Sequence, residues 1–190
     1  MSEKEKEMEI AAQAGRIRFD ASQGPRIVGP DDGKAVDLGS VGVRFMAWTE
    51  ETGGLFSLVE HPIPPKTLVA PLHIHEREDE YSFVLEGRMG AKLGDDVVYA
   101  EAGDFAFKPR SQWHTFWNPD DAPCRILEII APGGFEHFFD ELATLMAGEF
   151  DPDELAELGA HYGHYFKPET VPELCAEHGL THPMLEALPD

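Results

Sequence analysis

The stretch Pro71-Leu-His-Ile-His-Glu-Arg-Glu-Asp-Glu80 decides the fold. His73 and His75 stand two residues apart, and side chains alternate between the two faces of a β-strand, so both imidazoles are expected on one face. Glu80 lies an odd number of residues after His75, and on an uninterrupted strand it would point the other way. We therefore expect residues 76–79 to form a turn that lets these three side chains converge.

A second stretch, Pro109-Arg-Ser-Gln-Trp-His114, adds a third histidine. Three imidazoles and one carboxylate can bind a divalent transition metal and still leave coordination positions open for water or substrate. The residues at positions 76, 78 and 79 are further acids beside Glu80. The residue types alone therefore predict a metal site but leave the identity of its carboxylate ligand open.

Two spacing patterns carry a resemblance to a known family. The first is His73-x-His75, four residues, Glu80, six residues, Gly87; the second is Gly103, five residues, Pro109-x-Ser111, two residues, His114, three residues, Asn118. They resemble the two cupin motifs. The flanking segments 52–61 and 131–139 resemble those of single-domain cupins (monocupins) of the quercetin-dioxygenase-like type, and the resemblance covers roughly residues 41–146.

The resemblance implies an all-β cupin double-stranded β-helix, a jelly-roll barrel, here with C-terminal α-helices. It also implies one divalent transition metal (iron, nickel, manganese, copper or zinc) with His73, His75, Glu80 and His114 as its ligands. Position within the motif selects Glu80, and the neighbouring acids are expected in a solvated loop. Ser111 replaces the usual glycine, and it would cost about 1 kcal/mol if the turn needs a positive φ there.

The pattern of apolar runs and turn residues supports this fold class. Strands are predicted over 41–48, 55–61, 68–75, 81–86, 88–93, 97–101, 103–108, 114–117 and 125–131. Turn signals every eight to twelve residues or so are typical of a sandwich or barrel. Pro62-Ile-Pro-Pro65 is expected to end one strand pairing, because proline cannot donate to a ladder.

The segments outside the barrel differ in character. We predict an N-terminal arm with short strands at 16–20 and 25–28 (residues 1–40), the cupin barrel (41–133), and a helical C-terminal extension packed on the barrel (134–190). Helical spacing from Phe135 to Met146, a capping Asp151 and a left-handed cap at Gly179 predict the helices. The extension is expected to close one mouth of the barrel or to bury against a second subunit, and the sequence leaves both open.

Other side chains near the two motifs are candidates for roles around the site. Ser82, Val84 and Phe116 share strand parity with the ligands, so they are candidates for the substrate pocket, with ordinary core packing as the alternative. Trp113 and Trp117 have the opposite parity and are expected to pack outward. Of the other histidines, those at 161 and 164 are expected three apart on a helix, without a third ligand, and those at 61, 137, 178 and 182 are expected to be structural or exposed.

Composition limits the partners. The formal net charge of −21 over 190 residues argues against nucleic acid and anionic membranes, since both need basic patches. The two cysteines, Cys124 and Cys175, do not indicate a disulfide framework, and a cytoplasmic location is expected. The family habit and the aromatic-rich C-terminal segment predict a homodimer.

The sequence is compatible with three functions. The resemblance points to a metal-dependent oxygenase that uses dioxygen on a small enol, diol or flavonol-like substrate, with Glu80 as the catalytic base that takes up the substrate proton. The second is a non-oxidative isomerase, epimerase or lyase acting on a sugar or keto acid. The third is a non-catalytic metal or small-ligand binding module. The candidate pocket residues look apolar, which favours the oxygenase over the second function.

Overall fold

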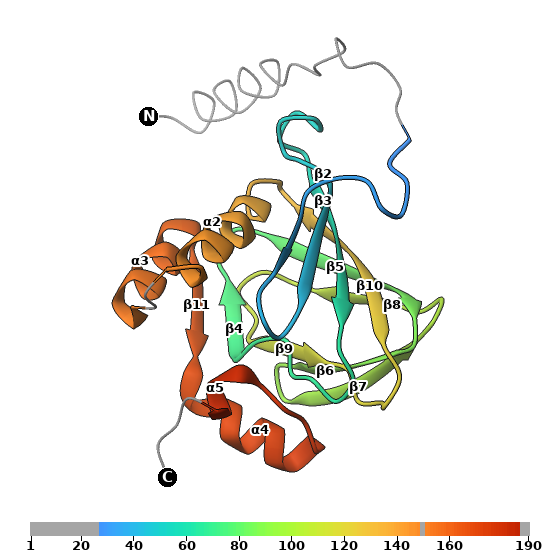
Figure 1. Cartoon of the computed structure of the whole chain (residues 1–190), viewed down its shortest axis with the longest axis vertical. Helices are drawn as coiled ribbons and strands as arrows, with labels where there is room; N and C mark the ends of the chain where they lie inside the picture. Colours follow the sequence, from blue (N-terminus) through green and yellow to red (C-terminus); the bar gives the residue numbers. More distant parts are fainter. Residues whose placement is uncertain (1–26, 149–150, 187–190) are drawn as a thin grey trace, which may run out of the picture.

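The computed structural model describes residues 27–148 and 151–186. Two β-sheets form a barrel (Figure 1). Each sheet contributes side chains to one shared apolar core. The six-stranded sheet has the order β1 (Ala35–Asp37), β2 (Gly42–Ala47), β3 (Ser57–Ile63), β10 (Cys124–Ala131), β5 (Asp79–Glu86) and β8 (Phe105–Lys108). The five-stranded sheet has the order β11 (His164–Lys167), β4 (Leu72–His75), β9 (His114–Trp117), β6 (Arg88–Leu93) and β7 (Asp96–Glu101).

The strand alternation that the sequence predicts is present, as β10 illustrates. Cys124, Ile126, Glu128 and Ile130 are buried, while the residues between them are only partly buried. Every pairing between named strands is antiparallel. This arrangement confirms the double-stranded β-helix. The predicted strand at 16–20 and most of that at 25–28 lie outside the described residues.

The turn between the two halves of the first motif is also present. β4 ends at His75 and β5 begins at Asp79, so the strand is interrupted before Glu80. The Glu80 side chain can therefore point toward the same side as the two histidines. The predicted end of a strand pairing within Pro62-Ile-Pro-Pro65 is confirmed, because β3 ends at Ile63, although Pro62 itself still pairs with Arg125 of β10. On its other side β3 pairs with β2 only through residues 58–60, so Pro62 lies beyond that ladder, where a missing N–H is tolerated.

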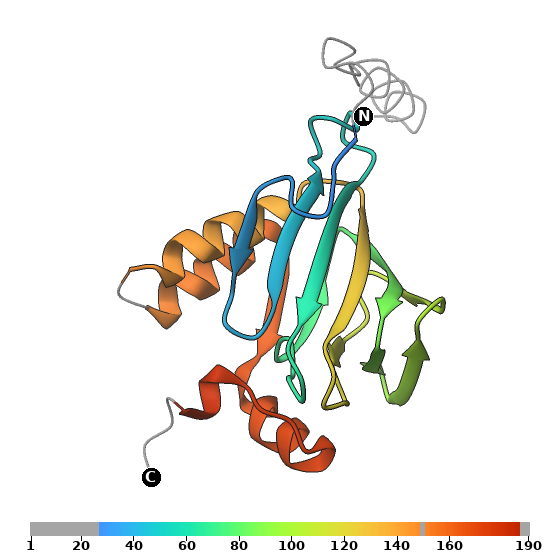
Figure 2. The same cartoon turned by 45° about the vertical axis from the view of Figure 1, so that its right-hand side comes forward.

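The described C-terminal region packs four α-helices and one short 3₁₀ turn around the barrel. They are α2 (Glu136–Met146), α3 (Pro152–Tyr162), η2 (Pro168–Thr170), α4 (Val171–His178) and α5 (Pro183–Glu186). Figure 2 shows α2 and α3 together on one side of the barrel and α4 with α5 beyond another end of it. None of the helices in the described part of the chain is long and apolar enough to cross a membrane.

The predicted helix boundaries follow from local capping chemistry. The Asp151 carboxylate accepts the Asp153 N–H at 2.9 Å, and Pro152 occupies the first position of α3. Gly179 ends α4 with a φ of 64°, and Leu180 behind it is buried, as the sequence predicts.

One element of this region was not expected. α3 stops at Tyr162, where Gly163 adopts a φ of 68°, and the following residues form β11. This strand pairs antiparallel with β4, with His164 opposite His75 and Phe166 opposite His73. The prediction that His161 and His164 share a helix is therefore wrong, because the left-handed Gly163 separates a helical from an extended segment. The C-terminal extension thus adds a strand to the sheet that carries the histidine motif.

The outer side of β9 is covered by α4. Trp117 is fully buried in an apolar cluster separate from the barrel core, which it shares with Leu68, Val171, Leu174, Cys175 and Leu180. Its neighbour Phe116 belongs to the barrel core instead. The predicted outward packing of Trp117 is therefore confirmed, and the C-terminal extension provides the surface against which it packs.

Candidate metal centre

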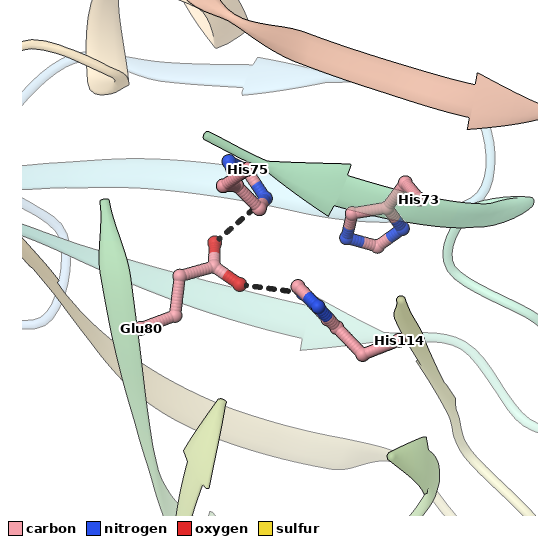
Figure 3. A group of neighbouring side chains, drawn as sticks. All are labelled: His73, His75, Glu80 and His114. Atoms are coloured by element: carbon pink, nitrogen blue, oxygen red, sulfur yellow. Dashed lines mark hydrogen bonds and ion pairs between the residues drawn. The ribbon is translucent and has the colours of Figure 1, made fainter. Parts of the chain in front are cut away.

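The two sheets bring the predicted ligands together inside the barrel. His73 and His75 project from β4, Glu80 from β5 and His114 from β9 (Figure 3). One ligand atom from each lies within 4.8 Å of the others, and all four side chains are buried. His73 and His114 are directly paired across β4 and β9, which places their side chains next to each other on one face.

Backbone carbonyls set the orientation of two of the imidazoles. His73 Nδ1 lies 2.9 Å from the Pro71 carbonyl oxygen, and His114 Nδ1 lies 3.0 Å from that of Gln112. A carbonyl only accepts, so each Nδ1 donates, and each Nε2 is the nitrogen that would face a metal. The donor set of imidazoles and one carboxylate therefore fits a divalent transition ion.

Glu80 is ionised within this group. Its Oε1 lies 3.5 Å from His75 Nε2, and its Oε2 lies 3.0 Å from His114 Nε2 (Figure 3). Oε2 is also 3.0 Å from Lys108 Nζ. Burial by itself would raise the pKa of Glu80, but Lys108 and the two imidazoles together hold it well below its usual range. A carboxylate that stays charged without solvent is ready to bind a cation.

Lys108 connects Glu80 to a second buried carboxylate. Lys108 Nζ lies 3.0 Å from Glu128 Oε2, which also accepts the Ser82 hydroxyl at 2.9 Å. Cross-strand register explains the cluster, since Glu80 is opposite Lys108 and Ser82 is opposite Glu128. Burial and the nearby charge of Glu80 leave the pKa of Glu128 raised to about 7 despite Lys108. The interior beside Glu80 is therefore charged and hydrogen-bonded.

This network was missed at the level of sequence, although a signal was available. Lys108 falls on the inward parity of β8, and Glu128 stands between Ile126 and Ile130 in the alternation of β10. Charged residues on an inward face call for partners, because unpaired charges are rarely buried. The expectation of an apolar interior around the predicted pocket residues is therefore only partly met.

The predicted pocket residues lie close to this network. Ser82 and Val84 are fully buried on β5, and Phe116 is buried on β9 with its ring 4.3 Å from Lys108 Nζ. Val84 and Phe116 belong to the apolar core. Their contact with a substrate stays a prediction.

The acids of the connecting turn do not form a uniform solvated loop. Glu76 is exposed and Asp79 pairs with Arg110 at 2.7 Å, but Glu78 is buried, which contradicts the expectation for that residue. Burial raises the pKa of Glu78 to about 7, and its Oε2 lies 3.9 Å from His75 Nδ1. Glu78 thus faces the far side of a candidate ligand rather than solvent.

A further imidazole adjoins the group from the unexpected strand β11. The His164 ring stacks on that of His75 at a centroid distance of 4.7 Å and lies 5.2 Å from that of His73. Burial and the neighbouring imidazoles hold the pKa of His164 well below its usual value. No local sequence signal reveals this position, because it depends on β11 pairing with β4.

The remaining histidines have structural surroundings. His61 is buried on β3 with its Nδ1 3.0 Å from the Gly42 carbonyl, and His178 stacks on Trp117 at 4.4 Å. His182 is buried, and His137 is partly exposed beside Glu50. Glu50, Glu136 and His137 also form a cluster of possible ligands. The Glu136 carboxylate, however, accepts the Thr49 and Gly134 N–H groups, which accounts for its burial.

Ser111 occupies the strained position that the motif comparison implied. Its φ is 61°, and its N–H donates to the His75 carbonyl at 2.7 Å. The serine therefore adopts the left-handed conformation of the usual glycine, and the loop that leads to His114 stays tied to β4.

Comparison with known proteins finds a family match for part of the chain. Residues 60–130 match the model of the cupin domain. Quercetin 2,3-dioxygenase of Bacillus subtilis is 26% identical over 130 residues, which cover 68% of this chain but only 38% of that enzyme.

Solved structures share the fold at low sequence identity. A predicted oxalate decarboxylase from Thermotoga maritima superposes with a TM-score of 0.53 at 20% identity, over 56% of this chain and 99% of that one. Ectoine synthase from P. lautus gives a TM-score of 0.51 at 18% identity, over 61% and 86% respectively. The matched residues 60–130 run from β3 to β10 and contain both ligand motifs, so this part of the chain is similar to the cupin domain, and the chain is similar to quercetin 2,3-dioxygenase of Bacillus subtilis.

Proposed function

We propose that this chain is a metal-dependent cupin oxygenase acting with dioxygen on a small enol, diol or flavonol-like substrate. The observation that carries the proposal is the buried convergence of His73, His75, Glu80 and His114 within 4.8 Å. A divalent transition ion held there would acidify a bound hydroxyl and bring it together with dioxygen. The similarity to quercetin 2,3-dioxygenase supports the choice of reaction class.

Glu80 is the proposed catalytic base. Its Oε2 is fixed by Lys108 and His114, whereas Oε1 has only the longer 3.5 Å contact to His75 and is the oxygen we expect to take the proton. The lowered pKa of Glu80 makes it a weak base. Proton uptake by Glu80 therefore requires that the substrate hydroxyl be acidified first, which links the base to the metal centre.

One observation favours the second function. The Lys108–Glu128–Ser82 network places a cation and a hydroxyl in the interior beside Glu80. Such groups suit the anionic oxygens of a keto acid or an enediolate better than the planar apolar body of a flavonol. A non-oxidative isomerase, epimerase or lyase therefore remains the alternative that the interior supports.

Metal content and oxygen dependence test these proposals together. Purified wild type is expected to hold about one metal equivalent by plasma mass spectrometry, and the His73→Ala/His114→Ala double variant to lose it. His161→Ala, whose side chain is exposed on α3 and belongs to neither cluster of possible ligands, serves as the matched control and should retain the metal. If the folded wild type binds none of iron, nickel, manganese, copper and zinc after loading, the proposed metal centre is wrong.

Turnover then separates the functions. Uptake of oxygen in proportion to loss of an enol or flavonol supports the oxygenase. Conversion of a sugar or keto acid under argon supports the non-oxidative alternative. Tight binding of a ligand without its consumption, in air and under argon, supports the binding module and contradicts both enzymatic proposals.

The homodimer is part of the same proposal. Phe83, Phe105 and Phe107 lie exposed on the neighbouring strands β5 and β8. Two copies of a chain with a net charge of −21 repel each other, so they are expected to meet over uncharged surface of this kind. Sedimentation velocity at low and high salt measures the state directly, and a monomer under both conditions would contradict it.

A further inference from the structure

The His164 imidazole is buried beside the metal centre. β11 pairs with β4 so that His164 stands directly opposite His75, and paired residues in an antiparallel ladder project on the same side. The His164 ring consequently stacks on that of His75 at 4.7 Å, with an interplanar angle of 14°. Its side chain therefore reaches the site from a segment outside the matched residues 60–130.

Besides the imidazoles of the site, three phenylalanine rings surround His164. The ring lies 5.2 Å from Phe135, 4.9 Å from Phe138 and 5.2 Å from Phe166, measured between centroids. These three rings fix the position of His164 but offer its nitrogens no hydrogen bond.

Both ring nitrogens of His164 are buried without a hydrogen-bond partner. Desolvating a donor and an acceptor without compensation is unfavourable, and in native proteins such groups are commonly satisfied by a water, an ion or a ligand. The cage of rings holds an unsatisfied imidazole at a fixed place next to four candidate metal ligands. A group bound at the centre would supply the missing partner.

His164 does not belong to the ligand set itself. The group whose atoms lie within 4.8 Å of one another comprises His73, His75, Glu80 and His114. An oxygen bound to a transition metal lies about 2 Å from it, and a hydrogen bond from nitrogen to that oxygen adds about 2.9 Å. His164 stacks on one candidate ligand without belonging to this group, which leaves a molecule bound to the ion, rather than the ion, as the partner for its nitrogens.

We propose that His164 is a ligand-binding residue of the centre, which hydrogen-bonds to the exogenous water, hydroxyl or carboxylate oxygen that occupies an open metal position. This inference rests on the metal centre proposed above. It assigns to the C-terminal extension a direct part in selecting what binds, because β11 carries the residue. Substrates with an oxygen at this position are favoured over those that present carbon there.

Binding of azide to the Co²⁺-loaded protein tests this role without requiring turnover. Azide coordinates Co²⁺ and accepts hydrogen bonds. The visible absorption of Co²⁺ reports the binding of Co²⁺ to the protein and the binding of azide to Co²⁺. His164→Leu removes both nitrogens and retains an apolar side chain for the cage. His161→Leu, three residues earlier and exposed, is the matched control, and His164→Gln restores an N–H donor.

The expected result is an azide Kd about tenfold higher in His164→Leu, unchanged within twofold in His161→Leu and intermediate in His164→Gln. The Co²⁺ Kd should change less than threefold in all three, and circular dichroism confirms that each is folded. If His164→Leu does not fold, His164→Gln decides, with a rise in azide Kd of at least threefold expected.

The contrary outcomes are distinct. An azide affinity unaffected by either His164 substitution overturns the inference and leaves the metal centre standing. A tenfold loss of Co²⁺ affinity would show that His164 is a fifth metal ligand, which also overturns the role stated here. Failure of the wild type to bind Co²⁺ removes the proposed centre itself, and this inference with it.

Discussion

At the scale of single residues, the site depends on the backbone conformation of Ser111 and on the charge of Lys108. Ser111 must adopt a φ of 61° so that its N–H reaches the His75 carbonyl. Lys108 is the single ammonium between the Glu80 and Glu128 carboxylates. Both residues lie next to the predicted ligands without belonging to them, and both can be tested separately from metal binding.

Ser111→Gly is expected to stabilise the protein by about 0.5–1 kcal/mol. The left-handed conformation costs an L-residue about 1–2 kcal/mol, and the added chain freedom of glycine offsets part of that gain. Ser111→Val is expected to destabilise, since a β-branched side chain tolerates a positive φ poorly. Denaturant unfolding of the two variants measures this order, and an equal stability of glycine and valine at this position would contradict it.

Lys108→Met is expected to cost about 3–5 kcal/mol, because it leaves two buried carboxylates without their cation. Adding Glu128→Gln should recover part of that loss, since Glu80 then no longer faces a second charge. A double-mutant cycle in the presence of a chelator measures the coupling. Strictly additive effects of the two substitutions would mean that the Lys108–Glu128 interaction does not contribute.

At the scale of elements, β11 is the decisive addition to the barrel. It extends the histidine-bearing sheet at β4 and lies against α3, so a helix, a turn and a strand act together to place His164. The contact with α3 is close at Gly159, where an added Cβ would lie 2.6 Å from the His164 carbonyl oxygen. This single glycine lets the helix approach the strand.

Gly159→Ala is therefore expected to destabilise the protein by more than 1 kcal/mol, although alanine in an exposed helix is favoured over glycine by about that amount. The clash is with backbone, so β11 must shift. Hydrogen exchange should rise at the β11 amides, and thermal unfolding should occur earlier. Glu157→Ala, on the exposed side of α3, is the control and should change stability by less than about 0.5 kcal/mol. A stabilised Gly159→Ala would show that the helix packs more loosely than described.

At the scale of the whole molecule, folding buries several uncharged imidazoles in different parts of the protein. Burial lowers the pKa of His61 to about 4 and that of His182 to about 4. In the unfolded chain these groups titrate near 6.5. Between these values the unfolded state binds more protons, so stability rises with pH and falls on acidification.

The pH dependence gives a prediction for the chelator-treated protein. Between pH 7 and pH 5, His61 alone should account for a loss of about 2 kcal/mol in the free energy of unfolding. His61→Gln should flatten the dependence by that amount while keeping a hydrogen-bonding side chain near Gly42. Urea unfolding at several pH values measures both slopes. Identical slopes in wild type and variant would show that His61 is not buried as a neutral group.

The sequence by itself determined what depends on local rules. Strand alternation and turn residues predicted a sandwich or a barrel, and the motif resemblance selected the barrel. The turn at residues 76–79 follows from parity, and the caps of α3 and α4 follow from Asp151, Pro152 and Gly179. Motif spacing also selected four residues that the structure brings within 4.8 Å of one another. Each of these features depends on residues that are close together in the sequence or that recur at the spacing of a known motif.

Only the tertiary structure decided which side chains surround the group. Lys108 and Glu128 meet Glu80 because β8, β5 and β10 are adjacent, and His164 arrives because β11 pairs with β4. Which strands pair, when they are distant in sequence, depends on how the whole chain buries its apolar faces. A local sequence pattern does not predict that pairing. The four candidate ligands could therefore be selected from spacing, whereas the charge and the additional imidazole beside them required the packed fold.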